Sequence, residues 1–259
     1  MQRMHSTPIK ICGLTREQDV DACVQAGVHA VGFVLYAPSP RAVTAARAAE
    51  LAQRLPAWVS PVLLFVNPTT EEVVQAALQV PGAWLQFHGD ESPEFCELAA
   101  SLTQRRWIKA IRFPTEPSPE HPTPKLLECA QLYQRAQALL LDTWVTGYGG
   151  GGHVFNWSQL PPSVNAHLVL SGGLTPANVA EGVRTLRHRG LSLAVDVSSG
   201  VESAKGIKDA QKIRDFALAV RSAETRILAS PLATNGNDPC LITNNPMPMA
   251  TLAPMADAL

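Results

Sequence analysis

Lys10-Ile11-Cys12-Gly13 closes a short apolar run near the N-terminus, and Thr15-Arg16-Glu17-Gln18 follows it with the Thr-x-x-Gln spacing of a helix start. The pattern predicts a strand followed by a helix. Because alternate side chains of a strand share a face, Lys10 and Cys12 point one way and the isoleucines beside them the other. An ammonium and a thiol therefore lie together at the C-terminal end of a first strand. In a β/α barrel this is the end where catalytic residues are found.

Seven further apolar, β-branched runs follow, and helical patterns alternate with them. The eight runs are IKICG (9–13), AVGFVLY (30–36), PVLLFVN (61–67), AWLQFHG (83–89), RWIKAIRF (106–113), ALLLDTW (138–144), HLVLSGG (167–173) and SLAVDVSSG (192–200). Near-continuous hydrophobic strands are typical of a parallel sheet that helices cover. A regular spacing could also indicate a solenoid, but no consensus repeat recurs. Eight β/α units fit a closed barrel better than an open doubly wound sheet, so we predict one (β/α)₈ TIM barrel over residues 8–223.

The last two connections and the C-terminus differ from the rest. Only Trp157 to Leu160 stand before Pro161-Pro162, which predicts a short helix between the sixth and seventh strands. The final helical stripe runs from Gly206 to about Ala223. Residues 224–259 are rich in proline and asparagine and show no sustained period, so we predict a disordered tail there.

Composition limits the possible functions. The 259 residues are near the length of one such barrel, and the formal net charge of −1 leaves no basic footprint for nucleic acid or an anionic membrane. No apolar run approaches the ~20 residues of a membrane span, and the first ten residues lack the apolar core of a signal peptide. The five cysteines have no C-x-x-C spacing. We expect a cytoplasmic monomer or homodimer that acts on a small molecule.

Two glycine-containing turns predict a phosphate site. Ser171-Gly172-Gly173 ends the seventh strand before a helix start at Thr175-Pro176, and Ser198-Ser199-Gly200 ends the eighth strand. Glycines let backbone amides approach an anion, and barrels often bind phosphate after strands seven and eight. Plain strand-to-helix turns also use glycine, but two such loops at these strands favour phosphate. The predicted phosphate-binding residues are Gly172, Gly173, Ser198, Ser199 and Gly200.

Asp142 at the end of the sixth strand is a candidate general acid. Alternation places it on the interior face with Leu140. A carboxylate after an apolar run is costly to bury unless it is paired or functional, and partial desolvation favours its protonated form. A loop-capping aspartate is the alternative. The following glycine run, Gly149, Gly150, Gly151 and Gly152, predicts a flap over a ligand, whereas a tolerated linker is the alternative.

Cys12 is a candidate base. A free thiol has a pKa of about 8.5, and a nearby cation such as Lys10 lowers that value. A core thiol is the alternative reading, which we assign to Cys23, Cys96 and Cys129 in the helical segments.

Further polar residues at strand ends are candidates for binding the substrate. Gln86 and His88 of the fourth strand and Asp196 of the eighth point inward with Lys10, and Arg41 after the second strand could meet a carboxylate. Each could also be a satisfied polar group or a solvated arginine. His88-Gly89-Asp90-Glu91 might suggest a metal site, but it has no matching ligand cluster elsewhere, so we expect no metal.

The motifs together resemble a known family. KICG, GFVLYAPSPR, FVN, LQFHGDE, LLLDT, YGGGGHVFNW, LSGGLTPANV and AVDVSSGVE occur in this order between about Ile9 and Ala223. In this they are similar to phosphoribosylanthranilate isomerases of tryptophan biosynthesis. Two positions depart from the usual pattern: Gly151 stands where a serine is usual, and Asn156 where an aspartate is usual.

The resemblance implies an Amadori rearrangement of N-(5'-phosphoribosyl)anthranilate to 1-(2-carboxyphenylamino)-1-deoxy-D-ribulose 5-phosphate. It implies that Asp142 is the general acid that opens the ribose ring and that Cys12 is the base that removes the C2 proton. It implies that Arg41 holds the anthranilate carboxylate, and it implies no cofactor or metal.

Three other functions fit the sequence less well. Histidine-pathway isomerases are similar but use an aspartate where Cys12 stands, and indole-glycerol-phosphate synthases need a lysine and glutamate set that we cannot place. A non-catalytic phosphosugar-binding protein would need neither Cys12 nor Asp142.

Overall fold

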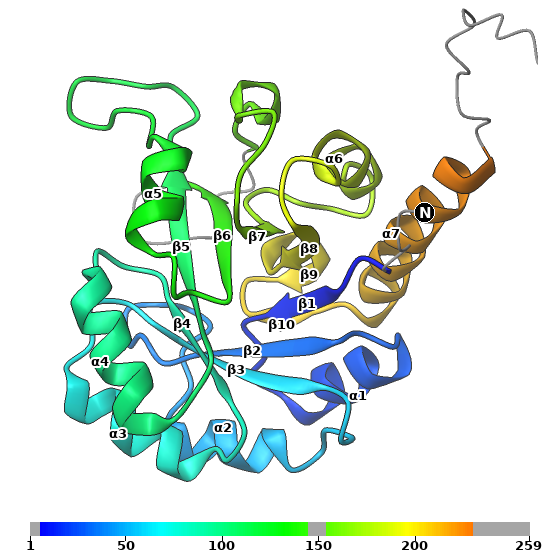
Figure 1. The fold of residues 1–259 in the computed structure, drawn as a ribbon. Helices are drawn as coiled ribbons and strands as arrows, with labels where there is room; N and C mark the ends of the chain where they lie inside the picture. Colours follow the sequence, from blue (N-terminus) through cyan, green and yellow to red (C-terminus); the bar gives the residue numbers. More distant parts are fainter. Residues whose placement is uncertain (1–5, 145–153, 230–259) are drawn as a thin grey trace, which may run out of the picture. The chain divides into compact units, whose positions relative to one another are not determined.

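Eight parallel strands close into a barrel in the computed structural model, which describes residues 6–144 and 154–229 (Figure 1). The strands are β1 Ile9–Cys12, β2 Ala30–Val34, β3 Ser60–Phe65, β4 Trp84–Phe87, β5 Trp107–Phe113, β6 Ala138–Thr143, β7 His167–Leu170 and β8 Ser192–Val197. β1 closes the ring because Lys10 is in register with Ala30 of β2 and with Asp196 of β8. The predicted barrel is confirmed, and each of the eight predicted runs coincides with one strand, although β3 begins one residue before its run, at Ser60.

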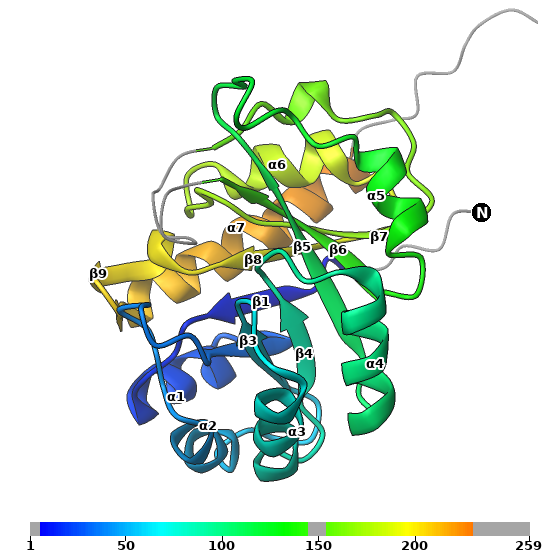
Figure 2. The same ribbon diagram turned by 90° about the vertical axis from the view of Figure 1, so that its left-hand side faces the viewer.

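Helices lie outside the ring of strands (Figures 1 and 2). They are α1 Glu17–Gln25, α2 Ala45–Ala52, α3 Thr70–Gln79, α4 Pro93–Thr103, α5 Leu126–Leu132, α6 Val179–Leu186 and α7 Ala210–Ala229. In the described part of the connection between β6 and β7, the short helix that the sequence predicted is the 3-10 helix η1 Trp157–Gln159. A second 3-10 helix, η2 Ser199–Val201, and a hairpin of β9 Glu202–Ala204 and β10 Ile207–Lys208 follow β8.

The sequence Thr69-Thr70-Glu71-Glu72 also predicts a helix start, which is confirmed, whereas the predicted starts at Thr15 and Thr175 differ in the structure. Thr69 forms a full capping box with Glu72 at the start of α3. Thr15 forms no such cap: Arg16 is the N-cap of α1, and the Thr15 hydroxyl donates to the carbonyl oxygen of Gly206 at 3.3 Å. The helix predicted to begin at Thr175-Pro176 begins instead at Val179, after a turn.

The last helix continues beyond its predicted end. Helix α7 continues to Ala229 instead of ending near Ala223, and Glu224 accepts a hydrogen bond from the Thr7 backbone N–H. The helix continues because residues 224–229 contain no proline or glycine to end it. The rest of the predicted tail, residues 230–259, lies outside the described residues.

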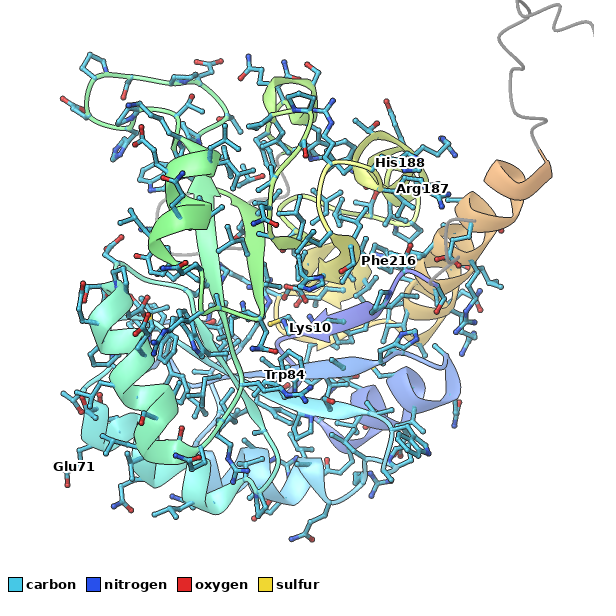
Figure 3. All side chains as sticks on the ribbon, in the orientation of Figure 1. Lys10, Glu71, Trp84, Arg187, His188 and Phe216 are labelled. Atoms are coloured by element: carbon cyan, nitrogen blue, oxygen red, sulfur yellow. The ribbon has the colours of Figure 1, made fainter. Side chains whose placement is uncertain are left out.

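The core has two layers, as the alternation predicted. Ile9, Ile11 and other outward-facing strand residues pack against the helices. Smaller apolar clusters lie on the inner faces of the strands, one around Cys12 and one around Leu140. In Figure 3, Lys10 and Trp84 lie among the strands, whereas Glu71 lies on the outer surface. The inner layer therefore mixes apolar side chains with charged ones, which need partners inside the barrel.

Candidate active site

A pocket lies at the C-terminal end of the barrel strands and collects most of the predicted site residues. Its lining includes Cys12, Arg41, Gln86, His88, Asp142, Gly172, Gly173, Asp196, Ser198 and Ser199. Lys10 and Gly200 are not in the lining. The predicted flap, Gly149 to Gly152, lies outside the described residues.

Lys10 and Asp196 form a buried ion pair beside Cys12. The Lys10 Nζ donates to the Asp196 Oδ1 at 2.9 Å, and both side chains are almost fully buried. Burial alone would lower the pKa of Lys10, but Asp196 and Cys12 outweigh burial and hold it above its ordinary value. Lys10 is therefore a fixed cation next to the thiol.

The Cys12 thiol is harder to ionise than the neighbouring Lys10 alone would suggest. Burial raises the pKa of Cys12, and Asp196 raises it further, whereas Lys10 and Lys208 lower it. The pKa is raised overall. The predicted effect of Lys10 on the thiol has the expected sign, but burial outweighs it.

Gly32 of β2 leaves the space that Cys12 and Lys10 occupy. A Cβ at Gly32 would lie 2.6 Å from the Cys12 Sγ, 3.2 Å from the Cys12 Cα and 3.2 Å from the Lys10 Nζ. Gly32→Ala must therefore displace the thiol. Because Cys12 is the predicted base, we expect kcat to fall by ~10²-fold, since displacing a reacting group by about 1 Å can cost that much. Steady-state kinetics on the folded variant measure the change.

Gly190→Ala is the matched control, because it also adds a methyl group where neighbouring atoms leave no space for one. Gly190 lies between α6 and β8, at the opposite end of the barrel, and its Cβ would lie 2.7 Å from the Ala166 carbonyl oxygen. We expect both variants to lose about 1–3 kcal/mol of stability and only Gly32→Ala to lose kcat. Equal kcat values would show that the position of the thiol does not matter.

Asp142, His88 and Gln86 form a hydrogen-bonded chain. The His88 Nε2 lies 2.8 Å from the Asp142 Oδ2, and the Gln86 Nε2 lies 2.9 Å from the His88 Nδ1. Strand β5 separates β4 from β6, and its interior residue Ala110 is small. The alternation placed each of the three side chains inside the barrel, but nothing in the sequence predicted that they bind one another.

The two predicted phosphate loops pack against each other. Gly172 and Gly173 have φ values of +76° and +65°, which favour glycine, and a Cβ at Gly172 would lie 2.3 Å from the Thr143 backbone nitrogen. A Cβ at Gly200 would lie 1.8 Å from the Leu174 carbonyl oxygen. The structure therefore places Gly200 behind the pocket, where it permits close packing of the two loops, while the other four residues line the pocket.

Sequence reasoning missed two charged residues, Glu202 and Lys208. Arg41 donates to Glu202 through Nε at 2.7 Å and through Nη2 at 2.8 Å, and Lys208 donates to Glu202 at 2.9 Å and to the Ser198 carbonyl oxygen at 3.0 Å. Burial would raise the pKa of Glu202, but the two cations lower it overall. Two cations share one carboxylate, so the cluster has a net positive charge behind Ser198. Both missed residues lie in a short hairpin, where no periodicity marks which side chains turn inward.

The remaining candidates have ordinary partners. Glu91 pairs with Lys109 at 2.8 Å and Asp90 with Arg112 at 2.6 Å, and His88 faces Asp142, so the His88-Gly89-Asp90-Glu91 segment is not a grouped ligand set. Asn156 caps η1 by accepting from the Ser158 N–H. Cys23 and Cys96 are buried in the core with a pKa raised by burial to about 12, and Cys129 packs against the same core, which confirms their packing role. Among residues 6–144 and 154–229, no helix is long and apolar enough to span a membrane.

Comparisons with known proteins agree with the resemblance of the motifs. A family model described as N-(5'phosphoribosyl)anthranilate (PRA) isomerase matches residues 9–219. The N-(5'-phosphoribosyl)anthranilate isomerase of Methylibium petroleiphilum is 55% identical over 226 residues, which cover 87% of this chain and 99% of the relative.

Solved structures show the same similarity. The phosphoribosyl anthranilate isomerase of Thermotoga maritima has 35% identity and a TM-score of 0.71, covering 83% of this chain and 99% of its own. A phosphoribosyl anthranilate isomerase solved in complex with reduced 1-(o-carboxyphenylamino)-1-deoxyribulose 5-phosphate has 32% identity and a TM-score of 0.66, with the same coverage. With its barrel and a pocket that holds a thiol, a carboxyl group and two glycine loops, this chain belongs to the N-(5'-phosphoribosyl)anthranilate isomerase family.

Proposed function

We propose that Cys12 is the general base and Asp142 the general acid of the isomerisation that defines this family. The observation that carries the proposal is that the two side chains, from β1 and β6, line one pocket at the C-terminal end of the barrel. Proton transfer to and from a sugar needs groups that reach different atoms of one bound molecule. Cys12 and Asp142 meet that need from separate strands.

The reaction then proceeds in two proton transfers. Asp142 gives a proton to the ribose ring oxygen, the bond between C1 and that oxygen breaks, and the anthranilate nitrogen forms a Schiff base with C1. The Cys12 thiolate removes the proton from C2, and the electron pair forms the enolamine, which tautomerises to the ketone. Neither step changes the oxidation state of the protein or consumes a second reactant.

The rest of the pocket supports binding of a phosphorylated, carboxylated substrate. Gly172, Gly173, Ser198 and Ser199 would hold the phosphate, and the net positive charge of the Arg41, Glu202 and Lys208 cluster lies directly behind Ser198. Arg41 would bind the anthranilate carboxylate with its guanidinium held in place by Glu202. Lys10, Gln86, His88 and Asp196 would complete the pocket.

Turnover of N-(5'-phosphoribosyl)anthranilate tests the proposed function directly. The purified full chain should consume this fluorescent substrate, and its fluorescence should decay with first-order dependence on enzyme. A folded chain that leaves the fluorescence unchanged would refute the function. The variants that test the roles of Cys12 and Asp142 are described in the Discussion.

Removing either partner of the ion pair beside Cys12 should shift the pH profile of kcat, and the two substitutions should shift it in opposite directions. Lys10 lowers the pKa of Cys12 and Asp196 raises it, and the base acts as thiolate, whose fraction rises with pH. Lys10→Met should therefore move the ascending limb of kcat to higher pH and lower kcat at neutral pH by at least ~10-fold, part of the ~10²–10⁴-fold that a general base contributes. Asp196→Asn should move the limb to lower pH.

Each variant is the control for the other, because both break the same ion pair and leave one buried charge. Disruption of the barrel alone would reduce kcat in both variants without shifting the two limbs apart. Lys208 also faces the thiol and stays in place in both variants. Limbs that move in the same direction would contradict the assignment of Cys12 as the titrating base.

We also propose that the enzyme works in the cytoplasm, as a monomer or homodimer, on a small phosphosugar substrate. The four cysteines within the described residues are all free, which fits a reducing compartment.

A further inference from the structure

Gln86 is the most deeply buried member of the chain that ends at Asp142. Its side chain is fully buried on the inner face of β4, its Nε2 lies 2.9 Å from the His88 Nδ1, and its Oε1 has no hydrogen-bond partner among the described residues. A glutamine amide can face a ring nitrogen with either its donor or its acceptor. Which of the two it uses decides where His88 carries its proton.

The free-energy cost of unpaired polar atoms favours the orientation in which the Gln86 amide N–H faces His88. With the amide nitrogen toward His88, the buried carbonyl oxygen and one N–H of the amide remain unpaired. With the amide reversed, both N–H groups would remain unpaired. Unpaired buried N–H groups are rarer in proteins than under-satisfied carbonyl oxygens, and each unpaired group costs about 1–3 kcal/mol. Gln86 therefore donates to the His88 Nδ1, which must be the unprotonated nitrogen of the ring.

The tautomer of His88 then determines what Asp142 can do. An unprotonated Nδ1 places the proton of a neutral imidazole on Nε2, and Nε2 lies 2.8 Å from the Asp142 Oδ2. The N–H donates to Oδ2 and leaves Oδ1 to carry the proton that is delivered. As that proton leaves, negative charge develops on Asp142, and the hydrogen bond from His88 becomes charge-assisted and stronger.

We propose that Gln86 is a positioning residue that holds His88 in the Nε2–H tautomer, so that His88 orients Asp142 and stabilises it as it gives up its proton. The inference rests on the proposed role of Asp142 as general acid. In the opposite tautomer the Nε2 lone pair would face Asp142, and a protonated Asp142 would donate its proton to His88 and not to the substrate. Gln86 thus acts on the reaction through two side chains and on one step only.

The ¹⁵N NMR spectrum of the histidine rings tests the inference without an activity measurement. In the full-length enzyme, His88 should show an unprotonated Nδ1 and a protonated Nε2, and the signal should be assigned by its loss in His88→Gln. A protonated Nδ1 in the unsubstituted enzyme would overturn the inference at once.

Gln86→Glu changes the partner of Nδ1 from a donor to an acceptor with almost no change of shape. We expect Nδ1 to become protonated and kcat to fall by at least ~10²-fold, with KM changed by less than about threefold, because the acid step and not binding is affected. Gln134→Glu, on the exposed surface, makes the same substitution and should change neither quantity. An unchanged tautomer or an unchanged kcat in Gln86→Glu would contradict the inference.

Gln86→Met is a second test variant in case a buried glutamate prevents folding. Methionine has similar length and neither donates nor accepts strongly, so His88 should populate both tautomers and kcat should fall less than in Gln86→Glu. A rise in KM with unchanged kcat would contradict the inference and show that Gln86 only contacts the substrate. If Asp142→Asn retained full activity, the proposed general acid itself would be wrong, and this result is distinct from a failure of Gln86 alone.

Discussion

Asp142→Asn should lower kcat by at least ~10²-fold and leave KM nearly unchanged. The asparagine has almost the same shape and its oxygen can still accept from the His88 Nε2–H, so the pocket should keep its geometry. An amide has no proton to give to the ribose ring oxygen at neutral pH, so ring opening loses its acid. Loss of substrate fluorescence under saturating conditions measures kcat, and a titration of substrate measures KM.

Asp21→Asn is the matched control for Asp142→Asn. Asp21 lies on the exposed side of α1, where it pairs with Arg54 at 2.6 Å, far from the pocket lining. Exposed ion pairs contribute little to stability, so this variant should keep its activity and nearly all of its stability. Near-normal turnover in Asp142→Asn would exclude Asp142 as the general acid.

Cys12→Ala should also lower kcat by at least ~10²-fold, because it removes the only group on the inner face of β1 that can take the C2 proton as a thiolate. Cys12→Ser separates shape from chemistry. Serine fills nearly the same volume beside Gly32 but is a far weaker acid than cysteine, so it supplies almost no anionic base near neutral pH. We expect the serine variant to be nearly as slow as the alanine variant, in the same fluorescence assay.

Cys23→Ala is the control for loss of a buried thiol. Cys23 is fully buried in α1 and packs in the outer core, where burial raises its pKa to about 12. Its removal should reduce stability through the cavity it leaves and should not change kcat of the folded enzyme. If Cys12→Ala and Cys12→Ser both turned over substrate at the rate of Cys23→Ala, another residue would have to be the base.

Local patterns in the chain were sufficient for the barrel and for the inner face of each strand. Eight apolar runs with helical segments between them predicted the strands, and the two-residue alternation placed Lys10, Cys12, Gln86, Asp142 and Asp196 inside. These features depend only on residues that are neighbours in the sequence, so they can be read from it. The glycines of the two phosphate loops were recognisable for the same reason.

Local signals were less reliable where distant parts of the chain compete for the same residue. Thr15 has the sequence of a helix cap, yet its hydroxyl donates to the carbonyl oxygen of Gly206, which lies 191 residues further along the chain. Helix α7 extends past Ala223, and Glu224 is held by the backbone of Thr7. In both cases a tertiary contact determines where the element begins or ends.

By itself the sequence determined the fold, the family resemblance and the positions of the thiol and the carboxyl group at the ends of β1 and β6. Only the tertiary structure decided that Asp142 meets His88, that Arg41 and Lys208 both pair with Glu202, and that burial outweighs Lys10 in setting the pKa of Cys12. Periodicity specifies which way a side chain points. Hydrogen bonds and pKa values depend on distances between residues of different strands and on how much water the closed barrel excludes, and these exist only once the chain has folded.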